Sequence, residues 1–128
     1  MSTLIVDNIE TISGDNFVST QISAAKAWVN FNGQGTVSIN KSFNVDSVTD
    51  LGVGLYQVNM TSGVFSNGNY AVIVDATRSN ANNSLLACPG YVNQTPDASQ
   101  CQIRVMDNRQ AGETAVDPPE VSVVFFDS

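Results

Sequence analysis

Histidine is absent from the 128-residue sequence, and charged residues make up only 13% of it. Without histidine, a single chain cannot assemble a Ser-His-Asp or a Cys-His nucleophilic site. It also has no imidazole to offer zinc, and two cysteines do not complete the usual four-ligand zinc site. The sequence therefore excludes these nucleophilic sites and a histidine-ligated zinc, and we expect no metal and no other cofactor.

Basic residues are scarce, and the net charge is −7. The five basic residues are scattered along the chain: Lys26, Lys41, Arg78, Arg104 and Arg109. Nucleic-acid and anionic-membrane surfaces both require clustered positive charge, so neither partner is expected. No apolar run approaches the ~20 residues of a membrane span, and residues 1–13 lack the pattern of a signal peptide. We expect the protein to remain in the cytoplasm where it is made, unless it leaves within a larger particle.

Apolar residues account for 42% of the chain, and 14 asparagines contribute to a polar but weakly charged surface. A chain of this length is large enough for one domain with a core of its own. A weakly charged, amide-rich surface suits contact with neutral or sugar-like ligands outside a cell. It is also common on inert β-scaffolds, so it does not decide between these roles.

Short segments of alternating apolar and polar residues, separated by glycine, asparagine and aspartate, indicate half-buried β-strands. The residues expected to face inward are Ala27, Val29 and Phe31; Val37, Ile39, Lys41 and Phe43; and Tyr56, Val58 and Met60. No segment keeps the 3.6-residue period of a helix. We predict an all-β, antiparallel β-sandwich of about seven to nine strands over residues 21–128.

Two segments, 70–77 and 120–127, carry apolar residues on both faces. Such strands need cover on both sides, whereas a two-layer sandwich covers only one. A symmetric oligomer would supply the second cover, and a small barrel or a loop folded over the sheet is the alternative. The oligomer hypothesis places Ile73, Val124 and Phe126 at an interface between copies.

Residues 1–20 contain one short strand pattern, around Leu4 and Val6, followed by a turn cluster at 13–16. An isolated strand is not stable in water, so this segment must pair with another element. It is predicted to be an N-terminal arm strand, which belongs either to the edge of the same domain or to a neighbouring copy.

Two long polar stretches, 78–100 and 107–120, separate the later strands, with short strands predicted at 85–87 and 103–106. Long loops tend to be functional. Amides, arginine and tyrosine there would suit contact with a glycan or protein receptor, although an ordinary polar loop has the same composition. The candidate receptor-binding residues are Arg78, Asn80, Asn82, Asn83, Tyr91, Asn93 and Arg109.

Cys88 and Cys101 are 13 positions apart. If the strands that carry them pair, a disulfide would close the intervening loop and contribute about 3 kcal/mol. Two free structural thiols are the alternative, because a cytoplasm is reducing.

Trp28 has the outward parity of its strand, which fits burial between subunits, burial under a loop, or contact with a receptor. Asp75, Asp97, Asp107 and Asp117 are the acids from which a glycosidase-like carboxylate pair or a calcium site would have to be built. None of these acids occurs in a recognisable motif, so we expect ordinary solvated side chains.

Residues 25–60 resemble the C-terminal domain of tail fibres of marine bacteriophages, notably those that infect cyanobacteria. The strings that carry the resemblance are AKAWVNFNG (25–33), GTVSINKSFNV (35–45), VTDLGVGLYQVNM (48–60), NYAVIVDAT (69–77), VSVVFFD (121–127) and the opening STLIVDNI (2–9). The turn at 51–55 departs from the family, which more often has polar residues around its glycines. The resemblance implies a homotrimeric virion protein whose tip contacts the host surface, and it implies no catalytic residues.

The sequence thus leads to one functional hypothesis, a non-enzymatic tail fibre or fibre-like accessory subunit in the virion. Its expected partners are further copies of itself, other virion proteins and a host-surface glycan or protein. A purely structural decoration or tail-assembly protein without receptor binding is the alternative. A polysaccharide-degrading enzyme is a third, less favoured interpretation.

Overall fold

The computed structural model describes residues 25–77, 85–89, 95–107 and 114–127, and these form nine strands and no helix. The strands are β1 (Ala27–Asn32), β2 (Ser38–Phe43), β3 (Val45–Gly52), β4 (Leu55–Met60), β5 (Ala71–Thr77), β6 (Leu85–Pro89), β7 (Gln100–Asp107), β8 (Thr114–Ala115) and β9 (Glu120–Phe126). The predicted all-β class is confirmed. The predicted N-terminal arm, residues 1–20, lies outside the described part of the chain.

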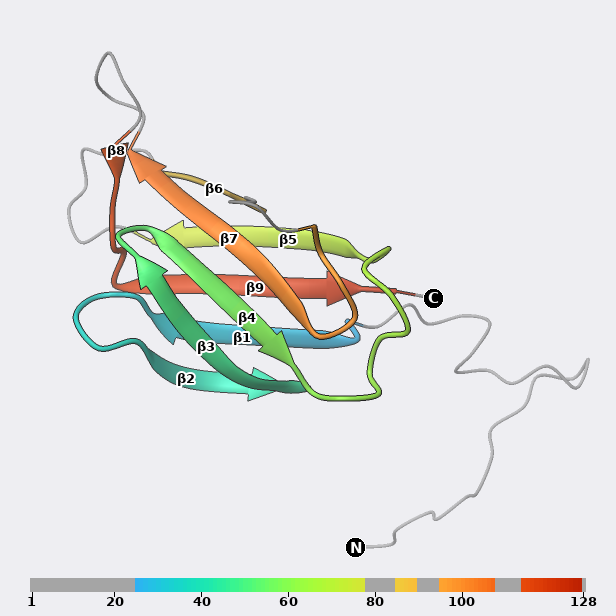
Figure 1. The fold of residues 1–128 in the computed structure, drawn as a ribbon. Helices are drawn as coiled ribbons and strands as arrows, with labels where there is room; N and C mark the ends of the chain where they lie inside the picture. Colours follow the sequence, from blue (N-terminus) through green and yellow to red (C-terminus); the bar gives the residue numbers. More distant parts are fainter. Residues whose placement is uncertain (1–24, 78–84, 90–94, 108–113, 128) are drawn as a thin grey trace, which may run out of the picture.

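Two antiparallel sheets pack face to face. One has the strand order β2-β1-β9-β5, and the other has the order β3-β4-β7-β6, with β8 pairing with β7 beyond the start of β4. In Figure 1, β3, β4 and β7 cross obliquely in front of β1 and β9. The predicted antiparallel β-sandwich is therefore confirmed, and we call its layers the β1 sheet and the β4 sheet.

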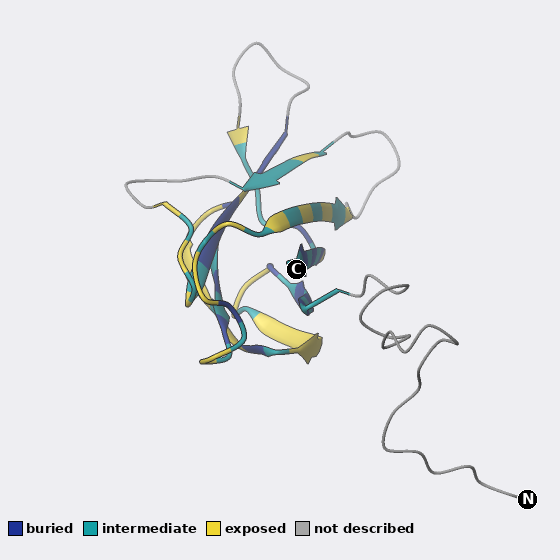
Figure 2. Ribbon diagram, turned by 90° about the vertical axis from the view of Figure 1, so that its right-hand side faces the viewer, coloured by how far each residue is buried: buried dark blue, intermediate teal, exposed yellow. Residues whose placement is uncertain are grey.

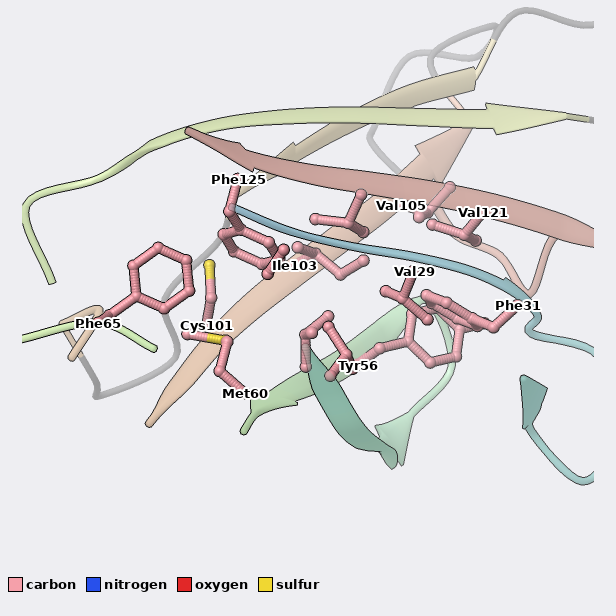
Figure 3. Close-up of a cluster of buried hydrophobic side chains, with 14 residues drawn as sticks. Val29, Phe31, Tyr56, Met60, Phe65, Cys101, Ile103, Val105, Val121 and Phe125 are labelled. Carbon is pink, nitrogen blue, oxygen red and sulfur yellow. The ribbon is translucent and has the colours of Figure 1, made fainter. Parts of the chain in front are cut away.

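The core fills the space between the two sheets. Strands β1 and β4 alternate strictly between buried and partly exposed residues, as the sequence predicted, and β9 has the same alternation from Val121 onward. Figure 3 shows side chains from both sheets meeting there. The largest fully buried residues include Phe31, Tyr56, Ile103, Val123 and Phe125. Alternation works as a signal because successive side chains of a strand point to opposite faces.

The β4–β5 connection closes one end of the core with aromatic rings. Phe65 is buried, and its ring centroid lies 4.8 Å from that of Tyr70 and 6.0 Å from that of Phe125. The rings of Tyr70 and Phe125 meet edge to face at 5.3 Å. Such offset and edge-on contacts add to the area that the rings bury.

Strand β2 differs from the prediction. The register between β1 and β2 shifts after Asn30, which faces Lys41, so that Phe31 faces Ile39 and Asn40 is the extra residue of a β-bulge. The bulge reverses the faces of the residues that follow it. Lys41 and Phe43 therefore lie on the outer face, and all six residues of β2 are exposed. The expected inward positions of Lys41 and Phe43 were wrong.

The ends of the sandwich are distinct. At one end the Gly33 amide donates to the Pro118 carbonyl, and the Gly54 amide donates to Asp117. At the other, Lys26 and Asp127 form an ion pair of 3.6 Å. The chain therefore enters β1 and leaves β9 at the same end, visible near the C label in Figure 1. We call this the terminal end, and the opposite one the free end.

At the free end, a hydrogen bond joins Tyr56 of β4 to Asp117, which lies in the segment between β8 and β9. The Tyr56 ring is fully buried, and its hydroxyl lies 2.8 Å from Oδ1 of Asp117 and 3.1 Å from the Gly33 carbonyl oxygen. The same carboxylate oxygen accepts the Gly54 amide at 2.8 Å. Burial, and then the neighbouring carboxylate of Asp117, raises the pKa of Tyr56 far above its ordinary value. The hydroxyl is therefore a permanent donor.

Candidate interaction surface

The outer face of the β1 sheet carries a line of apolar side chains that runs across all four strands. Trp28 on β1 is the register partner of Phe43 on β2 and of Val124 on β9, and Val124 in turn faces Ile73 on β5. We call these four residues the outer apolar row. Phe126 lies two residues beyond Val124 on the same strand and the same face.

This row is open to solvent. Ile73 is 59% exposed and Phe43 is 50% exposed, while Trp28, Val124 and Phe126 are partly buried. Figure 2 shows β2 exposed along its length and β5 alternating between exposed and intermediate residues. None of the described loops covers Ile73. Apolar patches of this kind mark interaction sites on soluble proteins.

The three interface residues expected from the sequence, Ile73, Val124 and Phe126, therefore share one face. Phe43 was missed because nothing in the alternation of 36–43 reveals a bulge at Asn40. The outward parity of Trp28 was visible in the sequence, and its alignment with the other three residues came only from strand order. Oligomerisation itself stays a prediction.

A second line of side chains, polar in character, runs beside the outer apolar row. It consists of Lys41, Asn30, Ser122 and Asp75, from β2 to β5, and we call it the polar row. The Asn30 amide nitrogen donates to Ser122 Oγ at 2.9 Å and to Glu120 Oε1 at 2.8 Å. Asn40, the bulge residue, donates to Asn30 Oδ1 at 2.8 Å. These bonds fix the centre of the row and leave the charged residues at its two ends.

The candidate receptor-binding residues all lie outside the described part of the chain: Arg78, Asn80, Asn82, Asn83, Tyr91, Asn93 and Arg109. Their flanking residues are placed. Thr77 faces Glu120, and Asp107 faces both Leu85 and Thr114, so the described residues on either side of 78–84 and of 108–113 lie at the free end.

Segment 90–94 is anchored differently. The residues that follow it turn near the terminal end, where the Tyr70 hydroxyl donates to the carbonyls of Asp97 and Gln100. The described residues that follow Tyr91 and Asn93 therefore lie at the opposite end from those that flank the other five candidates. Sequence order alone does not show this separation.

The β3–β4 hairpin adds an apolar tip at the free end. Val53 is 61% exposed and Leu51 is 42% exposed. Gly54 follows with a φ of 67°, and a β-carbon there would run into the Val105 carbonyl, so the turn needs glycine. The tip belongs to the segment in which the sequence departs from the tail-fibre pattern.

The two cysteines are free thiols, and the disulfide hypothesis is contradicted. Strands β6 and β7 do pair, but Cys88 faces Arg104 rather than Cys101. The three-residue offset along β7 amounts to about 10 Å and places the two cysteines on opposite faces, beyond the reach of a disulfide. Cys101 is buried in the core, and burial raises the pKa of its thiol to about 11.

The acids named from the sequence do not converge on a common site. Asp117 accepts the Tyr56 hydroxyl, whereas Asp75 lies on the outer face of β5. Asp97 caps its own turn through Ser99 and Gln100, and the hydrogen bond from the Ser99 hydroxyl is the main reason that the pKa of Asp97 is lowered. Within the described ranges, no three acidic, cysteine or histidine residues form a group suited to a metal ion.

No helix long and apolar enough to cross a membrane occurs among the described residues. Comparison of the chain with protein-family models, with curated proteins and with solved structures finds no match.

Proposed function

We propose that this chain is a homotrimeric, non-enzymatic tail fibre or fibre-like accessory subunit of a bacteriophage, which attaches the virion to a host-surface glycan or protein. The observation that carries the proposal is the solvent-exposed outer apolar row. In the single chain, Phe43 is 50% exposed and Ile73 is 59% exposed. A further copy of the chain would remove that surface from solvent.

The two ends of the sandwich suit different roles, attachment at the terminal end and receptor binding at the free end. Because Lys26 and Asp127 are adjacent, the chain enters and leaves the domain at one end. An attachment through that end leaves the free end, with the Leu51–Val53 hairpin tip and the anchors of 78–84 and 108–113, pointing outward. Loops on a rigid β-scaffold are the usual location of binding residues.

Three copies on one rigid head would bind by avidity. Simultaneous engagement of several weak sites raises the overall affinity by about 10²–10⁴ without any new contact. Three chains of net charge −7 carry −21 in total. Approach to an acidic cell envelope therefore needs screening by salt or bridging by cations, and adsorption should be faster at marine ionic strength than in dilute buffer.

Labelling of intact particles with an antibody against this chain tests the assignment. Label at the distal tail, together with inhibition of adsorption by the purified protein, is the expected result. Label on the capsid would contradict the fibre and favour the decoration protein. Release of reducing sugar from host envelopes by the purified chain would instead revive the enzyme interpretation.

A further inference from the structure

Two opposite charges lie at opposite edges of the outer face and at the same height along the strands. Lys41 on β2 faces Asn30, Asn30 faces Ser122, and Ser122 faces Asp75 on β5. Three strand spacings separate the two charged residues, about 14 Å, which is too far for an ion pair within one chain. Both side chains are exposed, and neither has an ion-pair partner among the described residues.

The apolar residues at the same two edges are matched in the same way. Phe43 lies two residues beyond Lys41 on β2, and Ile73 lies two residues before Asp75 on β5. Because the strands are antiparallel, Phe43 and Ile73 are also at one height, through Trp28 and Val124. One edge thus offers an aromatic ring and a cation, and the other offers an aliphatic side chain and an anion.

We propose that the β2 edge of one copy binds the β5 edge of the next copy, with Lys41 paired to Asp75 and Phe43 packed against Ile73 across the contact. This inference rests on the proposed homotrimer and specifies its interface. A rotation about an axis parallel to the strands keeps every residue at its height, so both pairs form together. Head-to-tail contacts of this kind close into a three-fold ring when successive copies are rotated by about 120°, and that ring has three equivalent contacts.

The β2 edge is suited to contact through side chains rather than to extension of the sheet. The bulge at Asn40 interrupts its register, and Lys41 lies beside it. Bulges and lysines are the devices that prevent another strand from adding to an exposed edge. The copies therefore meet through the outward-facing side chains of β2 and β5, and the Lys41–Asp75 ion pair fixes the relative height of the two copies.

Charge reversal tests the pairing. Lys41→Asp and Asp75→Lys each place like charges opposite each other, and each should weaken assembly at least about tenfold. The double variant restores opposite charges in reversed order and should assemble nearly as well as the original chain. Arg104→Asp is the matched control, because it makes the same charge change on the outer face of the β4 sheet, where Arg104 is exposed.

Sedimentation velocity at several concentrations gives the assembly state of each variant. Loss of the trimer in both single variants and its recovery in the double variant is the expected pattern. Trimeric single variants, or a double variant that stays dissociated, would overturn the Lys41–Asp75 pairing while leaving the proposed trimer intact. An original chain that is monomeric at high concentration would overturn both, and a dimer would overturn the three-fold ring.

A second measurement needs no substitution. Zero-length carbodiimide cross-linking of a mixture of isotopically light and heavy chains joins adjacent lysine and carboxylate side chains. A mixed light–heavy peptide that links Lys41 to Asp75 is expected. Efficient cross-linking of other pairs between copies, with this pair absent, would refute the proposed contact even if every variant failed to fold.

Discussion

Replacement of Tyr56 by phenylalanine isolates one hydrogen bond in the core. The ring keeps its place, fully buried between the sheets, and only the hydroxyl is lost. That hydroxyl lies 2.8 Å from the Asp117 carboxylate, which also accepts the Gly54 amide. A hydrogen bond to a charged group contributes about 1.5–3 kcal/mol. Asp117 is only partly buried, so water can replace some of the lost bond. We expect Tyr56→Phe to lower the free energy of unfolding by about 2 kcal/mol.

Urea titration at neutral pH measures this loss, at equal protomer concentration because oligomerisation contributes to apparent stability. Tyr70→Phe is the control, since its hydroxyl donates to the neutral carbonyls of Asp97 and Gln100. The control should lose about 1 kcal/mol or less. A loss below about 0.5 kcal/mol for Tyr56→Phe, or a larger loss for the control, would refute the role of the Tyr56–Asp117 bond.

The stabilities of the original chain and of Tyr56→Phe can also be compared as the pH is raised. The pKa of Tyr56 is raised in the folded chain, so its stabilising contribution is complete below the ordinary tyrosine value of about 10. Above that value the unfolded chain loses the proton and the folded chain keeps it, so the contribution falls by about 1.4 kcal/mol per pH unit. The stability difference between the two proteins should therefore shrink by about 1.4 kcal/mol between pH 9 and pH 11. A difference that grows over this range would contradict the burial of the hydroxyl.

Three further predictions follow from the turns, the candidate receptor segment and the thiols. Gly54→Ala should lower the free energy of unfolding by about 3 kcal/mol or more in urea titration, because its β-carbon would meet the Val105 carbonyl at a positive φ. Gly35→Ala is the control: its φ is 61° but it lies in open space, so it should lower the free energy of unfolding by about 1 kcal/mol. Equal losses would contradict the close packing at Gly54. Replacing residues 80–83 with Ser-Gly sequence should leave the solution mass unchanged and reduce adsorption of particles, and unaltered adsorption would remove this segment from the receptor site. Cys88 should react with a thiol reagent in the folded protein and Cys101 only after unfolding, and a mass 2 Da below that of the dithiol would contradict the two free thiols.

Alternation predicted the buried faces of β1 and β4 because neither strand carries an extra residue, and the register shifts in their pairing insert the extra residue into β2 or β3. It failed at β2, where a single extra residue, Asn40, moves Lys41 and Phe43 to the other face. No residue type in SINKSF marks the bulge, which depends on how β2 pairs with β1. A local pattern cannot contain that information.

The interaction surface was predictable only in part. The excess of apolar residues on β5 and β9 led to Ile73, Val124 and Phe126, which share the outer face, and their role at an interface stays a prediction. The alignment of Trp28 with Phe43 and Ile73 needed the strand order β2-β1-β9-β5, which joins segments far apart in the sequence. The register of β6 on β7 likewise decided the cysteines, because pairing alone left Cys88 three positions from Cys101.

If further copies of the chain cover the outer apolar row, the purified chain must have the solution mass of a trimer. One chain has a mass of 13.6 kDa. Multi-angle light scattering of the purified protein across a range of concentrations should give about 41 kDa, three times that mass. A mass of 13.6 kDa that persists at the highest concentration would show that no further copy covers the outer apolar row.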